Sequence, residues 1–304
     1  MMKRMIELKG ISKRFGQHPV LRDFSMHVNQ GEIVGLLGPN GSGKTTTIRL
    51  INGVIHPDSG QMTVAGYDPV HDGEPIRRVS GILTETAGFY VHMTALQNLT
   101  FYADLYGVTD SHRSLELLEE FGLMANRDQK VGTFSTGMKK RLGLAKALLH
   151  RPGILFLDEP TNGLDPEGIR MVLSYIRRLN QRDGTTMILC SHLLQQLEAV
   201  CHRYVFLQGG RVIEEGTLPD LEARYVTEVK LLAETNLGLT GDTYKGVAAQ
   251  RKGEGKLEFT LPSKQAVPAF LRELTREADV YGASLLNQDL ESLYFKIREV
   301  AGRE

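Results

Sequence analysis

The sequence has few cysteines, no long apolar run and no excess of either charge. Among its 304 residues only Cys190 and Cys201 are cysteines, and they do not form a Cys-x-x-Cys spacing. This scarcity argues against a disulfide scaffold or a zinc site and is typical of a reducing compartment. No stretch contains the 18 or so uninterrupted apolar residues that a membrane-spanning helix needs. We therefore expect the chain itself to be soluble and cytoplasmic.

The charges balance, because lysine plus arginine and aspartate plus glutamate both number 36. No global field attracts the protein to nucleic acid or to acidic lipid, so any basic function must be local. The length suits one large domain and a small one. Each motif described below occurs once, so the sequence shows no internal duplication.

Short apolar runs alternate with longer amphipathic stretches, which predicts a largely parallel sheet flanked by helices, an α/β fold. The runs are EIVGLLG (32–38), GILFLDEP (153–160) and TTMILCSH (185–192). Ligands of open α/β sheets bind beyond the carboxyl ends of the strands, and these runs end in Gly, Asp or His. We therefore expect the chemistry at these strand ends.

The pattern predicts two domains. The first covers residues 1–225 and contains a helical insertion over about 86–150, which continues into a helix after Ser135. The second covers residues 226–304, where segments of strand and helix character follow one another as β-β-α-β-α. This order predicts a small α+β domain of ferredoxin-like type.

The segment GPNGSGKT (38–45) fits the pattern G-x-x-x-x-G-K-[ST], follows an apolar strand and opens a helix. Glycines allow successive backbone N–H groups to face phosphate oxygens at a helix N-terminus. Lys44 is expected to reach the β- and γ-phosphates, and the Thr45 hydroxyl to bind Mg²⁺. The plain alternative is a glycine-rich turn. The residues expected to bind the nucleotide here are Gly38, Pro39, Asn40, Gly41, Ser42, Gly43, Lys44, Thr45 and Thr46.

Two further strand ends carry candidate groups. Asp158 ends an apolar strand, where its carboxylate can contact Mg²⁺, and the adjacent Glu159 is suited to accept a proton from an attacking water. His192 ends another strand and is expected to contact the γ-phosphate or that water. The alternatives are a solvated cap before Pro160 for the acidic pair, and a loop cap for His192.

The segment FSTGMKKRL (134–142) places Lys139, Lys140 and Arg141 close to the start of a helix capped by Ser135. A helix N-terminus is already positive, so each exposed cation there costs roughly 0.3–1 kcal/mol. This predicts a negative partner nearby. Alternatively, some of these cations lie on the solvated side, opposite the apolar face. That face consists of Met138, Leu142, Ala145 and Leu149.

The ordered motifs GPNGSGKT, FSTGM, ILFLDEP, NGLDP and the strand-end His192 resemble those of the nucleotide-binding subunits of ATP-binding cassette (ABC) transporters, over roughly residues 4–220. The resemblance implies a P-loop NTPase cassette with ATP and Mg²⁺ as cofactors. It also implies a homodimer, or a pair with a related subunit. FSTGM resembles the divergent LSGGQ signature of drug and antibiotic exporter ATPases of the bacitracin or daunorubicin type.

In that family the signature of one subunit points at the γ-phosphate held by the other subunit, so the resemblance implies that Ser135 and Gly137 donate to phosphate in trans. Thr136 replaces the first glycine of the usual signature, and its side chain is expected to weaken ATP-driven dimerisation. Phe15 lies where the family stacks an aromatic ring on adenine, with a core phenylalanine as the alternative. Asp165 matches the dimer-contact loop, or else caps a helix.

Before the helical insertion the family usually has glutamine, and Glu85 stands at the equivalent place. A carboxylate cannot donate a hydrogen bond as an amide can, but Glu85 remains a candidate metal contact. Phe89, Tyr90 and His92 follow it, either as a docking surface for a membrane helix or as aromatics packed within the insertion. The segment 226–304 resembles the accessory domain of such exporters.

The sequence thus predicts an ATPase subunit that powers a separate permease at the cytoplasmic face of the membrane, as part of an exporter of drug, antibiotic or another amphiphile. The alternative is a soluble ABC ATPase that acts on nucleic acid or ribosomes. Such machines usually have tandem cassettes or a basic face, and neither is visible, so no nucleic acid partner is expected. An importer would more often combine LSGGQ with glutamine at position 85.

Overall fold

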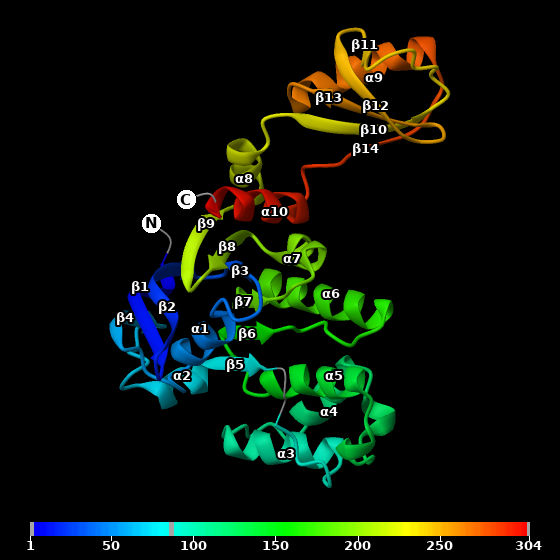
Figure 1. Ribbon diagram of the computed structural model, residues 1–304. Coiled ribbons are helices and arrows are strands. Elements are labelled where there is room, and N and C mark those ends of the chain that lie inside the picture. The colour runs from blue at the N-terminus through cyan, green and yellow to red at the C-terminus, as the bar shows by residue number, and fades with distance from the viewer. Residues whose placement is uncertain (1–2, 85–87, 303–304) are drawn as a thin grey trace. The chain divides into compact units, whose positions relative to one another are not determined.

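The computed structural model describes residues 3–84 and 88–302 (Figure 1). The chain forms two compact units, Met1–Glu215 and Gly216–Glu304. The division falls before helix α8 (Leu218–Tyr225), so this helix belongs to the second unit, whereas the sequence pattern predicts the boundary after residue 225.

A six-stranded sheet forms the centre of the first unit, in the order β5-β6-β7-β3-β8-β9. Within the series β5-β6-β7-β3-β8, each pair of neighbouring strands is parallel, as the sequence predicts. Every residue of β3, β6 and β7 is buried, which matches the apolar runs of parallel strands covered on both faces. The strands are β3 (Ile33–Leu37), β5 (Ser80–Leu83), β6 (Ile154–Asp158), β7 (Thr186–Cys190), β8 (Arg203–Gln208) and β9 (Arg211–Gly216).

Helices connect these strands, and α6 shows how local sequence determines where such a helix begins and ends. In α6, apolar residues with helical spacing, from Val172 to Leu179, are buried against the unit. Asp165 caps its first turn, and Gly184 ends it with a left-handed φ of 64°. The connecting helices are α1 (Lys44–Ile51), α2 (Gly73–Val79), α6 (Pro166–Asp183) and α7 (Leu194–Val200).

An antiparallel sheet of three strands, in the order β2-β1-β4, lies beside the central sheet. Its strands are β1 (Arg4–Phe15), β2 (His18–Asn29) and β4 (Ser59–Val64). Ile6, Leu8 and Ile11 of β1 belong to a buried core that it shares with β3, β6 and β7. Phe15 pairs with His18 at the tip of the β1–β2 hairpin, so the aromatic ring lies at the end of a sheet rather than inside it.

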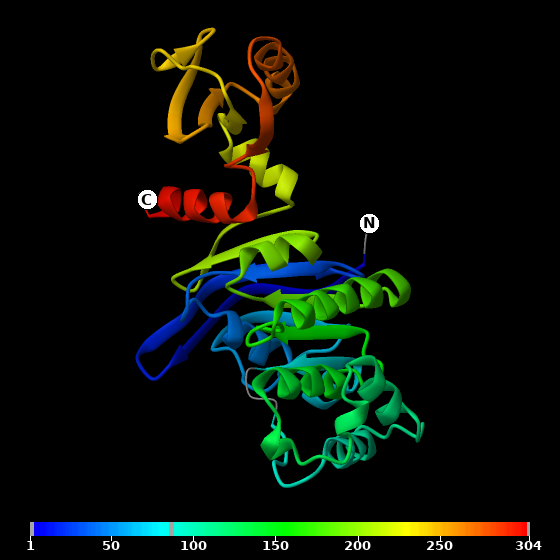
Figure 2. The ribbon, with the colours of Figure 1, turned by 90° about the vertical axis from the view of Figure 1, so that its right-hand side faces the viewer.

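A group of helices fills the segment between β5 and β6, and Figures 1 and 2 show α3 to α5 together, away from the β1-β2-β4 sheet. Thr94 caps α3 in a capping box with Gln97, and Ser135 caps α5 by accepting a hydrogen bond from the Met138 N–H. The predicted cap at Ser135 is therefore confirmed. The group consists of α3 (Ala95–Leu105), α4 (Arg113–Glu120), the 3₁₀ turns Met124–Asn126 and Val131–Thr133, and α5 (Thr136–Ala147).

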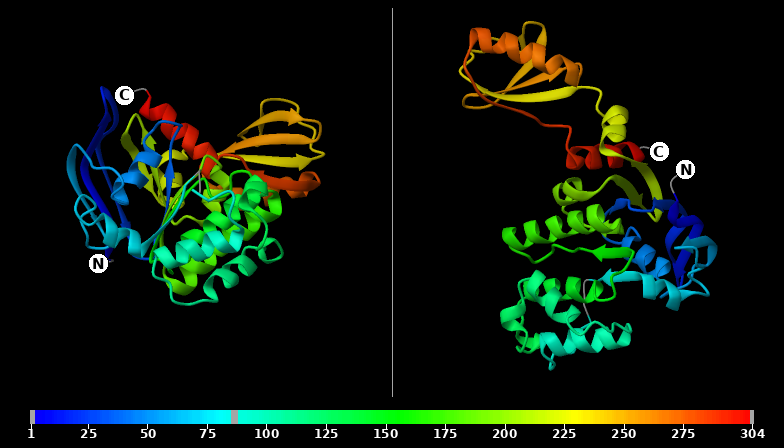
Figure 3. Two further views of the ribbon diagram at one scale, coloured as in Figure 1. Left: turned by 90° about the horizontal axis from the view of Figure 1, so that it is seen from below. Right: turned by 180° about the vertical axis from the view of Figure 1, so that it is seen from behind.

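The second unit has a five-stranded antiparallel sheet in the order β11-β12-β13-β10-β14 (Figure 3). Its hydrophobic core includes Phe270 and Leu274 of α9. Leu290, Leu293 and Ile297 form the buried stripe of α10. After α8, its elements are β10 (Val229–Thr235), β11 (Thr243–Tyr244), β12 (Val247–Gly253), β13 (Lys256–Leu261), the 3₁₀ turn Lys264–Ala266, α9 (Val267–Glu277), β14 (Val280–Leu285) and α10 (Leu290–Ala301).

The predicted β-β-α-β-α order omits β11 and β12, and the ferredoxin-like assignment is wrong. That fold has a helix between its first two strands, whereas the described chain passes from β10 to β11 without one. The strand β12 reads VAAQRKG, and only Ala249 in it is buried. It therefore lacks the apolar alternation by which a strand is recognised in a sequence.

Candidate functional site

The glycine-rich loop between β3 and α1 has the backbone that phosphate binding requires. Gly41 and Gly43 have φ values of 80° and 111°, in the region that favours glycine. A Cβ atom on Gly43 would lie 2.5 Å from Cδ2 of Leu21, so no side chain fits there. In the described part of the chain, the N–H groups of Asn40, Gly41 and Gly43 have no backbone acceptor. They are therefore available to an anion at the start of α1.

Lys44 and Thr45 connect this loop to the end of β6. The Lys44 Nζ donates to the carbonyl oxygens of Gly38 and Pro39, at 2.7 and 3.0 Å, so the ammonium lies over the loop. The Thr45 Oγ1 donates to Oδ2 of Asp158 at 3.0 Å. Burial raises the pKa of the Asp158 carboxyl. A cation bound beside it would stabilise the ionised carboxylate.

Glu159 is held at the end of β6 by the end of β7. Its backbone has a left-handed φ of 50°, which costs about 1–3 kcal/mol for a residue with a side chain. The Ser191 hydroxyl and the His192 N–H donate to its two carboxylate oxygens, at 3.2 and 3.1 Å, and the His192 Nδ1 lies 3.0 Å from Oε2. The fold thus brings Glu159 and His192 together, and Ser191 joins them.

One cleft of about 580 Å³ is lined by the Lys44 and Thr45 side chains together with Asp158, Glu159 and His192. Phe15 lines it and is 46% exposed, so it is not a core residue. Val20 and Asn162 line the cleft too, although no motif in the sequence includes Val20 and no role was predicted for Asn162. Val20 lies in β2, the second strand of the hairpin whose tip holds Phe15, so an expected β1–β2 hairpin was the signal that could have placed it near the ring. The lining residues are Phe15, Val20, Asn40, Gly41, Gly43, Lys44, Thr45, Thr46, Asp158, Glu159, Asn162 and His192.

Ser135, Gly137 and Asp165 do not line this cleft. Asp165 caps α6, since its Oδ1 accepts from the Gly168 N–H at 2.9 Å. Ser135 is exposed at the start of α5, and Gly137 in its first turn is partly exposed.

The three cations that follow the signature are not a solvated row. Lys140 is buried, and its Nζ lies 3.4 Å from the backbone oxygen of Asp158. Arg141 donates to the carbonyl oxygen of Phe121 at 3.0 Å, and Lys139 is only partly exposed. These contacts explain two of the cations without a phosphate.

The predicted metal ligands are only partly described. Glu85 lies outside the described residues, whereas Thr45 and Asp158 are in contact. Within residues 3–84 and 88–302, no three His, Cys, Asp or Glu side chains cluster as a metal site would require. This pattern fits Mg²⁺, which is typically bound by one or two protein groups together with phosphate and water oxygens.

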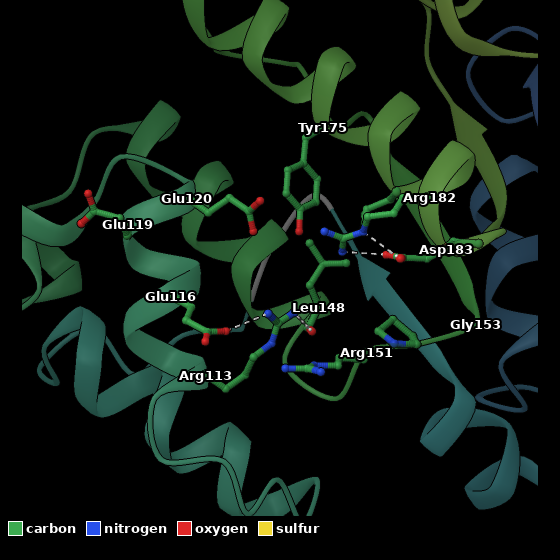
Figure 4. Close-up of a pocket in the computed structure, with 13 residues that line it drawn as sticks. Arg113, Glu116, Glu119, Glu120, Leu148, Arg151, Gly153, Tyr175, Arg182 and Asp183 are labelled. Carbon is green, nitrogen blue, oxygen red and sulfur yellow. Dashed lines mark hydrogen bonds and ion pairs between the residues drawn. The ribbon is translucent and has the colours of Figure 1, made fainter.

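A larger cavity, of about 740 Å³, lies between α4, α6 and the segment that leads into β6 (Figure 4). Side chains of both charges line it, and four of them form ion pairs with one another. Arg113 lies 3.4 Å from Glu116, and Arg182 lies 2.8 Å from Asp183. Because arginines and acidic residues line it together, the cavity lacks the concentrated positive charge that would attract a nucleotide. The glycine-rich loop marks the better site despite its smaller cleft.

A parallel sheet whose strand ends carry a glycine-rich anion loop, a lysine, a hydroxyl and an acidic pair defines the P-loop class of nucleoside triphosphatases. Comparison with known proteins narrows this class. Residues 21–162 match the family described as ABC transporter. An uncharacterised ABC transporter ATP-binding protein of Bacillus subtilis, YdbJ, is 35% identical over 300 residues, which cover 97% of this chain and 96% of that protein.

Other relatives agree. The bacitracin transport ATP-binding protein BcrA of Bacillus licheniformis is 39% identical over 223 residues, covering 73% of each chain. A solved ATP-binding subunit of an ABC transporter has a TM-score of 0.68 and 32% identity, over 73% of this chain and 93% of that one. The dimeric post-hydrolysis state of an ATP-binding cassette with ADP and Pi has a TM-score of 0.65 and 25% identity, over 70% and 98%.

The chain therefore belongs to the ATP-binding proteins of the ABC transporter family. It is an ATP-binding subunit of an ABC transporter and an ATPase of the cassette type, and the predicted fold class and family are confirmed. Subunits of this kind work with membrane permease components. None of the helices in the described part of the chain is both long enough and apolar enough to cross a membrane.

Proposed function

We propose that this subunit powers the export of a drug, antibiotic or other amphiphile through a separate permease, by ATP-dependent closure of a dimer. The family relationship supports this direction of transport. BcrA of Bacillus licheniformis is named for bacitracin transport, and LnrL of Bacillus subtilis, 37% identical over 223 residues, for linearmycin resistance. Nothing in these relationships favours the alternative of a machine that acts on nucleic acid or ribosomes.

The hydrogen bond between Thr45 and Asp158 carries the proposal for the chemistry, because it joins the phosphate loop to the acidic strand end. Mg²⁺ would be held by these two residues, with Glu85 as a further candidate contact. Lys44 would bind the β- and γ-phosphates once nucleotide draws it from the loop carbonyls. Glu159 would orient the attacking water and accept its proton.

His192 is proposed to contact the γ-phosphate or the attacking water, and Phe15 to stack on the adenine. Both line the same cleft as Lys44. His192 follows the buried strand β7, and Phe15 is the last residue of β1, at the tip of the β1–β2 hairpin. An exposed ring beside the loop offers a stacking surface without losing core packing.

A second copy, or a related subunit, is proposed to complete the site. The start of α5 is exposed and capped by Ser135, so its free N–H groups can face phosphate bound by the partner. Gly137 and Asp165 would contribute to the same interface. The permease would hold this pair at the cytoplasmic face of the membrane, and the second unit would help to stabilise the pair.

Co-purification tests the transporter assignment. Tagged Glu159→Gln protein, expressed in its native host and solubilised from membranes with detergent and Mg-ATP, should retain a stoichiometric integral membrane protein that mass spectrometry identifies. Lys44→Ala protein, prepared in parallel, is the control for ATP-dependent retention. Recovery of ribosomal or DNA-repair proteins without any membrane protein would instead support the soluble machine.

Aromatic side chains from the segment before α3 and from α3 itself form the proposed docking surface for a membrane helix of the permease. The Tyr90 ring packs on Phe101 with centroids 5.0 Å apart, and both rings are more than a third exposed. Lys146 of α5 lies over the rings of Tyr102 and Phe89, at 4.2 and 5.5 Å. The cluster is therefore anchored on one side and exposed on the other, as a docking surface requires.

Replacing Phe89 and Tyr90 together by alanine is expected to reduce permease recovery by about tenfold or more, because aromatic anchors commonly contribute 2 kcal/mol or more to an interface. Quantitative mass spectrometry of the detergent-solubilised complex measures the loss. Tyr281→Ala, which removes an exposed aromatic ring from the second unit, is the matched control. Unchanged permease recovery with the double variant would rule out this surface.

A further inference from the structure

The start of α5 lies directly against the loop that follows the acidic pair of the same chain. A Cβ atom added to Gly163 would lie only 2.9 Å from Cγ2 of Thr136. One added to Gly137 would lie 3.4 Å from Cδ2 of Leu164 and 3.5 Å from the Gly163 oxygen. The Thr136 methyl group thus rests on the Gly163 backbone, and no larger residue fits at position 163 without movement.

The same loop is connected to the nucleotide cleft. Asn162 lines that cleft, and its N–H donates to the Glu159 carbonyl oxygen at 3.3 Å. The Leu164 N–H donates to the Thr161 oxygen at 3.2 Å, and Asp165 caps α6. Two consecutive turns therefore fix the Gly163 backbone relative to Glu159, so a displacement at Gly163 is transmitted to the carboxylate segment.

A second contact joins α5 to the beginning of this segment. The buried Lys140, four residues after Thr136, places its Nζ 3.4 Å from the backbone oxygen of Asp158. The first turns of α5 thus contact the segment at Asp158 and again at Gly163. A helix is stiff over this length, so the two contacts make α5 and the 158–165 segment move together.

We propose that Thr136 is a positioning residue, whose methyl contact with Gly163 couples the signature helix to the Glu159 segment and the nucleotide cleft of the same chain. The inference rests on the proposed function, in which the start of α5 binds the phosphate held by the partner. Binding of that phosphate would shift α5. Through the contact between Thr136 and Gly163, this shift would change the position of the loop that contains Asn162. Thr136 therefore makes a contact with the loop that glycine, the usual residue at this place in the signature, could not make.

A double-mutant cycle in the full-length protein tests the coupling. Gly163→Ala is made in the wild-type, Thr136→Gly and Thr136→Val backgrounds, and kcat, KM for ATP and the unfolding temperature are measured for all variants. The strain of alanine at the φ of 79° is common to the three backgrounds and cancels. Valine keeps a methyl group at this position and replaces the hydroxyl by a second methyl of similar size, so it is the matched control.

We expect the loss of kcat from Gly163→Ala to be at least about fivefold larger in the wild-type and Thr136→Val backgrounds than in the Thr136→Gly background, as contacting residues commonly couple. KM should stay within about twofold, because the phosphate loop is untouched. If Gly163→Ala does not fold alone, recovery of active protein by Thr136→Gly but not by Thr136→Val supports the same coupling.

Equal kcat losses in all three backgrounds would overturn the inference. So would coupling that appears in the unfolding temperature with unchanged kcat, because the contact would then serve stability alone. Lys44→Ala separates this failure from a failure of the proposed function. If Lys44→Ala hydrolyses ATP as the wild type does, the proposed phosphate site is wrong and the inference falls with it.

Discussion

Replacing Lys44 by alanine is expected to abolish productive binding of ATP. The Lys44 ammonium lies 2.7 Å from the Gly38 oxygen and 3.0 Å from the Pro39 oxygen, so it is held above the loop where the phosphates would bind. Hydrogen bonds to charged groups contribute about 1.5–3 kcal/mol each, so loss of the proposed Lys44 contacts with the β- and γ-phosphates predicts an ATP affinity weaker by about 10²-fold or more. Isothermal titration with ATP and Mg²⁺ measures this loss.

Arg49→Ala is the matched control for this substitution, since it removes one positive charge from an exposed position of the same helix. It should leave the affinity for ATP almost unchanged, because exposed charges are well screened at physiological salt. Equal ATP affinities of the two variants would show that Lys44 acts only through the general charge of α1, and the proposed phosphate contact would be discarded.

Replacing Glu159 by glutamine is expected to keep ATP binding and to slow hydrolysis by roughly 10²-fold or more, as the loss of a positioned general base commonly does. The amide has the size of the carboxylate, and its oxygen can still accept from the Ser191 hydroxyl or the His192 N–H. It cannot take a proton from water, however, so binding and chemistry should separate. Single-turnover hydrolysis of bound ATP measures the chemical step.

Glu167→Gln controls for the loss of one negative charge, because Glu167 lies exposed in the first turn of α6, close in sequence to the acidic pair. Its hydrolysis rate should match that of the wild type. A Glu159→Gln variant that hydrolyses ATP at the wild-type rate would remove Glu159 as the base. The carboxylate would then serve to hold the ends of β6 and β7 together.

Much of the first unit could be predicted because its parallel strands are buried on both faces. β3, β6 and β7 each lie within one of the three apolar runs that the sequence displays. The phosphate loop was equally recognisable, since glycine at Gly41 and Gly43 has a backbone cause that appears directly in the sequence.

The small second unit was harder to predict because its sheet is only partly covered. β10 and β13 have buried positions and were found, whereas β12 is mostly exposed and its residues carry no period of apolar side chains. β12 pairs with β13 through backbone hydrogen bonds, across the short turn that joins the two strands. Backbone pairing of an exposed strand depends little on side-chain type, so the pattern did not show it.

The sequence by itself determined the family, the phosphate loop and the residue types at the strand ends, because these depend on local backbone geometry and on short spacings. Only the tertiary structure decided that Ser191 holds Glu159, that Lys140 is buried behind Asp158 and that Thr136 rests on Gly163. These pairs are distant in the chain. Their contacts arise where parallel strands and α5 pack together, and no local pattern encodes that packing.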